Sequence, residues 1–248
     1  MGGEIGFWAL AVLAAALVGM GKGGLPVVGM LGVPVLALRL PATEAAGLLL
    51  PVYIASDAVG VWAYRRAFDR RNLAILVPAA AVGIGFGWAT AALVPERAVL
   101  ALVGLIGAVF AGMMLSRRGP PPAARPARLL PGLVWGAVTG FTSFVSHAGG
   151  PPYQVYVLPQ RLPKAVFAGT TTICFAAVNL MKLPPYWALG LVSADSLHRA
   201  ALLVVPASVA VFLGLWLVRR LPERLFFRLV TWALLIVSLR LLWQAAAG

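Results

Sequence analysis

Residues 21–26 read Gly-Lys-Gly-Gly-Leu-Pro, and they interrupt an apolar stretch that otherwise runs from Ile5 to Leu38. Glycine weakens a helix and proline removes one of its N–H donors, so these residues predict a break in the helix. A break at membrane depth leaves backbone N–H groups unpaired, and lipid cannot hydrogen-bond them. We therefore expect the break to be buried in protein or to line a watery cavity.

A second stretch of the same kind interrupts the apolar region from Leu133 to Leu158. It reads His-Ala-Gly-Gly-Pro-Pro over residues 147–152. The N-terminus of a helix attracts anions through its free N–H groups and its dipole, and glycines let the backbone approach a ligand. We predict that the two breaks face each other and form a binding site for a small anion.

The composition is that of an integral membrane protein. Of 248 residues, 61% are hydrophobic and 11% are charged, whereas a soluble domain carries about 25% charged residues. About eight stretches are long and apolar enough to span a bilayer as helices. The first stretch has no basic segment before it, which argues against a cleaved signal peptide. We attribute the net charge of +13 to loops that orient the protein in the membrane rather than to nucleic-acid binding.

The apolar stretches outside the two broken regions have clear polar boundaries. A Pro- and Arg-rich segment over residues 116–131 is predicted to be a cytoplasmic linker loop. Leu183–Ser196 contains two adjacent prolines and is predicted to be a surface loop with Tyr186 and Trp187 at the membrane interface. The predicted unbroken helices are Ala42–Tyr64, Leu73–Val94, Ala98–Leu115, Ala165–Leu180 with an extension at one or both ends, Leu197–Val218 and Leu225–Trp243.

The two halves resemble one another, with residues 1–115 as the first repeat and 132–248 as the second. Chance similarity between Gly- and Ala-rich segments is the alternative, but the matches occur in the same order and Pro-to-Gly spacing is identical in one of them. They pair Gly23-Gly24 with Gly149-Gly150, Pro41–Gly47 with Pro163–Gly169, Asp57 with Asn179, and Pro95–Arg97 with Pro222–Arg224.

The distribution of basic residues predicts the orientation. If each broken segment enters the membrane and returns, most basic residues fall on one face, in the loops around 65–71, 117–128, 161–164 and 219–228. By the positive-inside rule this face is cytoplasmic and both termini lie outside. The two repeats then have opposite orientations, an arrangement typical of secondary transporters. The other face receives Arg39, Arg97, Lys182, Arg199 and Arg240.

Three ionisable residues lie in or near apolar segments. Lys22 should face the interior and have a partner, because a lysine at membrane depth costs about 2.5–3.5 kcal/mol; the alternative is a lysine that reaches the headgroups. His147 could donate to the anion or couple transport to protons, or simply bond a nearby carbonyl. Asp57 could balance Lys22 or carry a proton, or pair with an arginine of the neighbouring loop.

Polar uncharged side chains near the breaks could complete a pocket. Thr170, Thr171 and Thr172 open the helix that carries Asn179. Their hydroxyls could bind an oxyanion, although buried threonines more commonly bond back to their own backbone. The same two readings apply to Thr142, Ser143 and Ser146 before the second break, and Tyr153 and Gln154 follow it.

Signals for an enzyme are poor. The sequence has no nucleotide-binding loop of the form GxxxxGK[ST] and no metal-spaced His/Cys cluster. With a single cysteine, Cys174, no disulfide can form within the chain. We expect no catalytic residues, no bound metal and no cofactor.

Together these motifs resemble the TauE/SafE family of sulfite exporter-like membrane permeases. The resemblance rests on Gly21–Gly24, Pro41–Gly47, Gly140–Gly150 and Pro163–Thr171, in both halves of the chain. It implies a bacterial-type plasma-membrane permease for sulfite, sulfoacetate or related organosulfur and carboxylate anions.

We therefore expect an all-α, inverted-repeat secondary transporter that moves a small anion by alternating access. The alternatives are an anion channel of the same architecture, a cation or metal permease, and a membrane anchor without transport; a homodimer is left open. The predicted substrate-binding residues are Gly21, Lys22, Gly23, Gly24, His147, Gly149, Gly150, Thr170, Thr171 and Asn179, with Asp57 and His147 as candidates for coupling.

Overall fold

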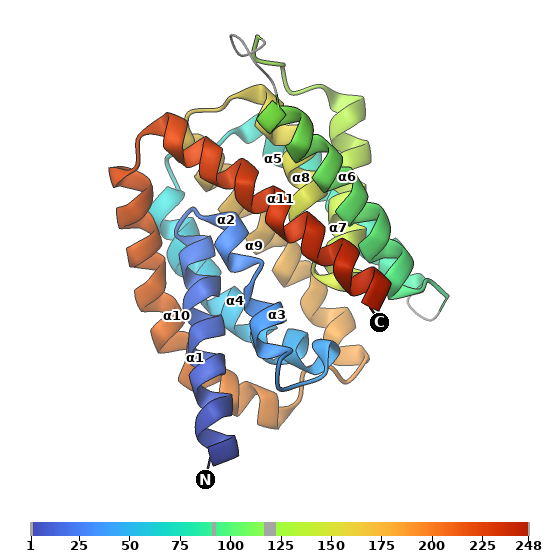
Figure 1. The fold of residues 1–248 in the computed structure, drawn as a ribbon, viewed down its shortest axis with the longest axis vertical. Coiled ribbons are helices and arrows are strands. Elements are labelled where there is room, and N and C mark those ends of the chain that lie inside the picture. The colour runs from blue at the N-terminus through green and yellow to red at the C-terminus, as the bar shows by residue number, and fades with distance from the viewer. Residues whose placement is uncertain (1, 91–92, 117–122, 248) are drawn as a thin grey trace.

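The computed structural model describes residues 2–90, 93–116 and 123–247, and this part of the chain is all-helical (Figure 1). Within it, eight helices are long and apolar enough to span a membrane, which confirms the predicted fold class. These are α1 (Gly2–Lys22), α4 (Ala42–Tyr64), α5 (Arg70–Ala89), α6 (Glu96–Ser116), α7 (Leu129–Ser146), α9 (Lys164–Ala188), α10 (Ala194–Arg220) and α11 (Glu223–Ala247). The short elements are α2 (Pro26–Gly29), α3 (Gly32–Leu36), α8 (Gly150–Val157) and the 3-10 turn η1 (Leu158–Gln160).

The first broken segment is a hairpin that enters and returns. After α1 ends, α2 and α3 run back along it, so that a side chain on Gly21 would meet the backbone of Gly29. One turn further along, Gly32 lies against Val18 and the carbonyl of Ala14. The contact partners of successive residues in the second arm lie progressively earlier in α1, so the two arms are antiparallel.

The second broken segment is also a hairpin. At its closed end Gly149 lies against Ser143 and the Thr139 carbonyl. At its open end the Tyr156 hydroxyl donates to the Arg128 carbonyl at 3.0 Å. The arm formed by α8 therefore returns along α7, as α3 returns along α1.

The packing partners follow the pattern that a two-fold exchange of the halves would produce. The first hairpin packs through α1 on α10 of the other half, and the second packs through α7 on α5. Helix α4 packs on its counterpart α9, and α6 on its counterpart α11, which run side by side in Figure 1. Three long helices separate the hairpins, so the second begins at the face opposite to the first. This arrangement is consistent with two repeats of opposite orientation.

Small residues allow both hairpins to pack closely on their partners. Gly19 of α1 lies directly against the Ala207 carbonyl of α10, and Gly140 of α7 lies against the Ala80 carbonyl of α5. A Cβ atom at either glycine would overlap the facing backbone. Close approach of this kind is how membrane helices gain packing energy when lipid supplies no hydrophobic drive between them.

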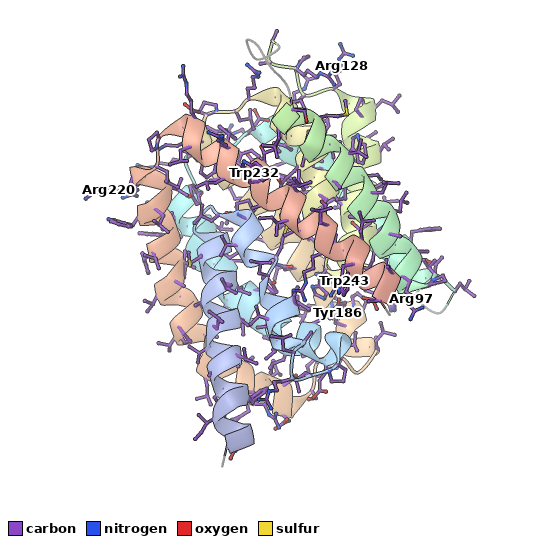
Figure 2. The ribbon with its side chains drawn as sticks, viewed as in Figure 1. Arg97, Arg128, Tyr186, Arg220, Trp232 and Trp243 are labelled. Atoms are coloured by element: carbon purple, nitrogen blue, oxygen red, sulfur yellow. The ribbon has the colours of Figure 1, made fainter. Side chains whose placement is uncertain are left out.

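The outer surface is apolar, as expected for a protein surrounded by lipid. Large exposed hydrophobic side chains stand on α5, α6, α10 and α11, and a soluble protein would not leave so many uncovered. In Figure 2, Arg128 lies at the top of the view, and Arg97 lies on the right side, near Trp243. Examples of the exposed apolar residues are Val82, Phe86, Leu102, Leu105, Val109, Val205, Val209, Phe212, Leu229, Trp232, Ile236 and Trp243.

The prediction of a surface loop over Leu183–Ser196 is wrong for its first part. Helix α9 continues through Pro184 and Pro185 to Ala188. A proline inside a helix usually breaks it, at a cost of about 3 kcal/mol, but here tertiary contacts hold the turn. Tyr186 is buried rather than interfacial, and its hydroxyl donates to the Phe144 carbonyl at 3.1 Å.

The division into two repeats and a linker stays a prediction. Helix α6 ends at Ser116, where the predicted linker begins, and α7 begins at Leu129, inside the predicted linker. Residues 117–122 of the linker lie outside the described residues. At the described end of the linker, the Arg125 amide donates to the Pro159 carbonyl at 3.1 Å, which attaches it to the second hairpin.

Candidate functional site

A cavity of about 70 Å³ lies where the two hairpins approach α4 and α9. A space of this size holds a few water molecules or one small ion. Of the residues predicted to bind substrate, Gly21, Lys22, His147, Gly150, Thr171 and Asn179 line it. Gly23, Gly24, Gly149, Thr170 and Asp57 are not among its lining residues.

Lys22 and Asp57 form a buried ion pair beside this cavity. The Lys22 Nζ atom lies 2.7 Å from Asp57 Oδ1, and both side chains are almost inaccessible to solvent. The ammonium group also lies 5.0 Å from the centre of the Tyr53 ring. The Lys22 side chain therefore neither reaches the headgroups nor lacks a partner, and Asp57 pairs with it rather than with an arginine of the loop.

Asp57 also joins the two halves of the protein. Its second oxygen, Oδ2, accepts a hydrogen bond from Asn179 Nδ2 at 2.7 Å. The two residues occupy equivalent positions in the sequence match, and α4 and α9 that carry them are equivalent helices. A contact between matched residues is what two repeats related by a two-fold axis would form near that axis, so this bond is consistent with the predicted duplication.

Lys182 is the second buried cation, and the sequence prediction placed it wrongly on the Arg-poor face. It lies inside α9, one turn beyond Asn179, and its side chain is only 1% exposed. Its Nζ atom donates to the Ser143 carbonyl at 3.2 Å and lies 3.5 Å from His147 Nδ1. Within the described residues, no carboxylate oxygen lies within 4.0 Å of it. An ammonium group has three N–H donors, so one remains for a ligand.

His147 connects Lys182 to Tyr186. Its Nε2 atom lies 2.7 Å from the Tyr186 hydroxyl, which in turn donates to the Phe144 carbonyl. One arrangement satisfies every group: Lys182 donates to Nδ1, and the Nε2–H of a neutral imidazole donates to Tyr186. The ring thus bonds side chains and not the backbone carbonyl that we considered as its alternative role.

The backbone of His147 is left-handed, with φ 52° and ψ 19°. It ends α7 through a hydrogen bond from the Ala148 amide to the Thr142 carbonyl. Gly24 follows α1 of the first hairpin and also has positive φ, +110°; there the Leu25 amide donates to the Met20 carbonyl, a bond one residue shorter in span. By this geometry Gly24 corresponds to His147, whereas the sequence match paired it with Gly150.

The N-termini of α2 and α8, which were predicted to hold the anion, both contain proline. Helix α2 has only four residues and begins with Pro26, which has no N–H group. The amides before it already donate to carbonyls of α1: Gly24 to Gly21 and Leu25 to Met20. Helix α8 carries two prolines in its first turn. Lysine side chains therefore bring the formal positive charge to the cavity, and a contribution from the helix ends stays a prediction.

The glycines outside the cavity have packing roles. Gly23 lies against the Val211 carbonyl and Gly214 of α10. Its own carbonyl accepts a hydrogen bond from the Tyr64 hydroxyl at 2.7 Å. Gly24 fits between Tyr64 and the neighbouring helices, where a side chain would overlap. These glycines allow the first hairpin to pack tightly, and neither lines the cavity.

The hydroxyl groups mostly bond to the backbone of their own helices. Thr170 donates to the Val166 carbonyl and accepts from the Asp69 amide, which places it at the loop between α4 and α5 and away from the cavity. Thr171 donates to the Phe167 carbonyl, and Thr172 reaches the Lys22 carbonyl at 3.2 Å. The same back-bonding occurs at Thr142 and Ser146. Thr171 and Thr172 still line the cavity.

Gln154 of α8 lines the cavity with an unused amide. The residue is 1% exposed. In the described part of the chain, neither its Nε2 nor its Oε1 atom has a hydrogen-bond partner. Buried polar groups are nearly always paired, because an unpaired one costs about 1–3 kcal/mol. The Gln154 amide is therefore free to bond a group that enters the cavity.

A second cavity, of about 270 Å³, adjoins the first. His147 and Met30 line both cavities and so lie between them. The larger one is bordered by helix ends on the Arg-poor face, at Glu96, Leu189 and Gln244. It forms a vestibule that leads from this face to the wall of the smaller cavity.

Sequence reasoning missed Lys182 and Tyr186 as site residues. Adjacent prolines directed Tyr186 to the predicted loop, and Lys182, beyond the predicted helix Ala165–Leu180, was assigned to the Arg-poor face. One signal could have placed them: Lys182 lies three residues after Asn179, and positions three apart share a helix face. Tyr186 lies one further turn along that face, so extending the helix through the prolines would have predicted the whole row.

Comparison with known proteins identifies the chain at the level of a family. The family model described as Sulfite exporter TauE/SafE matches residues 5–241, nearly the whole chain. No curated protein and no solved structure matches. Within the described residues, no group of three or more His, Cys, Asp or Glu side chains gathers in a way that could hold a metal ion.

Proposed function

From membership of the sulfite exporter TauE/SafE family, to which this chain belongs, we propose that it is a secondary transporter for a small sulfur oxyanion or a related anion. The family and the eight apolar helices make it a multi-pass membrane transporter. The substrate and the mechanism are our proposal. The substrate binds in the cavity between the two hairpins and exchanges between the two faces by alternating access.

The balance of charge around the cavity carries this proposal. Lys22 and Asp57 cancel one another as a close ion pair. Lys182 has no carboxylate partner in the described chain, so its ammonium form leaves one net positive charge in a buried space. A buried charge without a counter-ion is costly. A bound anion would supply that counter-ion, which favours an anion over a cation or a metal ion.

The hydrogen-bond donors of the wall suit an oxyanion. The free N–H of Lys182 and the unpaired Nε2 of Gln154 are donors at the cavity. Charge-assisted hydrogen bonds from ammonium to oxyanion are among the strongest in proteins. The cavity is small, so it admits only a small ligand that has few atoms besides its oxygens.

The two ends of the molecule differ in a way that supports alternating access. Toward the Arg-poor face, the vestibule approaches the site as far as His147 and Met30. Toward the Arg-rich face, the Tyr64 hydroxyl ties α4 to Gly23 of the first hairpin. Nearby, Asn72 and Gln160 exchange two hydrogen bonds, at 2.8 and 3.0 Å, that tie α5 to the second hairpin. We assign this arrangement to a state open toward the Arg-poor face.

By the positive-inside rule, we propose that the Arg-rich face is cytoplasmic and that both termini lie outside a bacterial-type plasma membrane. The vestibule would then open outward. Cysteine residues introduced singly at the described ends of the chain and in the 65–69 loop would be labelled from opposite sides by an impermeant thiol reagent. Labelling of both positions from the same side would contradict this topology.

Sulfite counterflow in proteoliposomes tests the function. Vesicles loaded with unlabelled sulfite should accumulate radiolabelled sulfite transiently, and uptake should saturate with concentration. A channel would instead give a current proportional to the driving force and no counterflow. Failure of sulfite and of small sulfonates to bind or move would contradict the proposal.

A further inference from the structure

We infer that the transported anion carries a single negative charge and, in addition, a hydrogen-bond donor of its own. This inference rests on the proposed function, because it concerns the ligand of the same cavity. It concerns the protonation state and polarity of that ligand, and two independent features of the wall support it: the number of uncompensated charges and the unpaired amide of Gln154.

The charge balance selects a monoanion. Among the described residues, the charged groups at the cavity are two cations, Lys22 and Lys182, and one anion, Asp57. Lys22 and Asp57 are 2.7 Å apart and form a neutral pair. A monoanion beside Lys182 therefore leaves the buried site neutral. A dianion would leave one negative charge without a partner in a water-poor space, at the cost that buried charges carry.

Gln154 selects a ligand with a donor. A primary amide offers donors at Nε2 and an acceptor at Oε1, and both atoms are buried without partners in the described chain. An anion that only accepts hydrogen bonds satisfies Nε2 and leaves Oε1 unpaired. A ligand that also has an O–H or N–H group satisfies both. Interchanging the amide nitrogen and oxygen does not alter this argument, because both atoms lack partners.

The other polar groups of the wall do not supply the missing donor to Gln154. Asn179 Nδ2 donates to Asp57, Lys22 Nζ pairs with Asp57 and Lys182 Nζ donates to the Ser143 carbonyl, and in the described chain neither ammonium group is within hydrogen-bond reach of Gln154. The hydroxyl of Thr171 donates to the Phe167 carbonyl, and Thr172 reaches the Lys22 carbonyl. The Gln154 acceptor thus remains available for a donor that the ligand brings.

The ligand class is a small monoanion in which one oxygen is protonated or an amino or hydroxyl group stands beside the anionic centre. Hydrogensulfite has this form, with one charge and one O–H. Sulfate and doubly charged sulfoacetate have one charge too many and no donor. Methanesulfonate has the right charge and no donor, so it should bind more weakly than a donor-carrying ion of the same shape.

Sulfamate and methanesulfonate provide a matched test, because they are similar in size, both are monoanions, and they differ by an amino group in place of a methyl group. Each is titrated as a competitor of radiolabelled sulfite binding to the purified full-length protein. We expect sulfamate to compete about tenfold or more better, the ratio that leaving one buried acceptor unpaired produces. In Gln154→Met, which keeps the side-chain length, this preference should disappear.

Each result bears on the inference. Equal competition in the wild type would overturn the donor requirement while leaving the proposed transport of anions intact. A sulfamate preference that persists in Gln154→Met would overturn the role of Gln154. Absence of sulfite binding itself would contradict the proposed function and the inference with it. If Gln154→Met does not fold, the wild-type ratio of the two competitors still decides whether a donor is required.

Discussion

The two hairpin tips have the same backbone design and different chemistry. Each ends its first helix with a hydrogen bond from an amide beyond the end to a carbonyl of that helix, Leu25 to Met20 in the first and Ala148 to Thr142 in the second, and each has a left-handed residue at the stop. That residue is Gly24 in the first hairpin and His147 in the second. Glycine adopts this conformation freely, whereas other residues pay about 1–2 kcal/mol for it. The second tip accepts this cost and gains an imidazole between the vestibule and the site.

The lysines beside the two tips differ in whether a carboxylate pairs with them. Lys22 belongs to the first hairpin and is neutralised by Asp57. In the second half, the residue equivalent to Asp57 is Asn179, which has no charge to offer Lys182. One half therefore contributes a closed ion pair and the other an open cation. Repeats with a shared backbone can thus provide a site that is asymmetric in charge.

The largest effect should come from removing the open cation. Lys182→Met keeps the apolar stem and deletes the charge, so the site loses both its net positive charge and its free donor. We expect sulfite affinity to fall by about 100-fold or more, since a hydrogen bond to a charged group contributes about 1.5–3 kcal/mol. Equilibrium binding to the purified protein measures this change.

Lys164→Met is the matched control for that variant. Lys164 is the one remaining lysine besides Lys22 and Lys182, and its ammonium group donates to the Leu221 carbonyl at the end of α10, away from the cavity. Its loss should leave sulfite affinity within about twofold of the wild type, because screened charges at a distance contribute little. Equal losses of affinity in the two variants would show that Lys182 acts through overall charge or folding and not at the site.

Breaking the Lys22–Asp57 ion pair should lower the stability of the protein. Lys22→Met and Asp57→Asn each leave one buried charge unpaired, which typically costs about 3–5 kcal/mol. Combining the two changes removes both charges, so the double variant should recover much of that loss. Thermal unfolding in detergent, with Tm compared across the three variants, measures the coupling. Additive losses in the double variant would show that the pair contributes nothing as a pair.

Substitutions at Gly24 and His147 compare the two left-handed residues that end α1 and α7. Gly24→Ala places a side chain at φ +110° and against the Tyr64 hydroxyl, so it should lower stability by about 2 kcal/mol or more. His147→Gly relieves a left-handed residue and should change stability by about 1 kcal/mol at most. The two Tm values provide the measurement. A larger loss at His147 than at Gly24 would mean that its ring contacts, and not its backbone, hold the second tip.

The smallest expected effect is on binding at the second tip. His147→Gly removes the Nδ1 partner of Lys182 but keeps the Ser143 carbonyl as an acceptor. We expect sulfite affinity to change by about three- to tenfold, the value of one neutral hydrogen bond. His147→Gln, which keeps a polar side chain, should lie closer to the wild type. A loss as large as that of Lys182→Met would make His147 itself a ligand.

The sequence predicted the fold well because its main signals are strong in a membrane. Charge is scarce within spans, so the helices and the two breaks stand out, and Lys22 and Asp57 are conspicuous as candidates. The adjacent prolines misled the prediction at Lys182 and Tyr186, since local propensity says nothing about the tertiary contacts that carry α9 past them. Thr170 was assigned to the site by its neighbours in sequence, but its bond to Asp69 faces the other way.

The partner of each polar group could not be deduced from the chain alone. Gln154 and Thr171 are both polar residues near the site, and only the structure shows that one is unpaired and the other bonds back to its helix. Likewise, the glycines of the first break are typical of close backbone approach to a ligand, yet Gly23 approaches α10 instead. Which neighbour a small residue admits depends on packing between distant segments.

The most direct test of the open cation is to locate an anion in the protein. A crystal soaked with selenite, a heavier analogue of sulfite, would reveal the anion by the anomalous scattering of selenium. The account predicts a peak in the cavity between the hairpins, with an oxygen within hydrogen-bond distance of Lys182 Nζ, and no such peak in Lys182→Met. A peak at Lys22 with Asp57 displaced, or one that persists without Lys182, would contradict it.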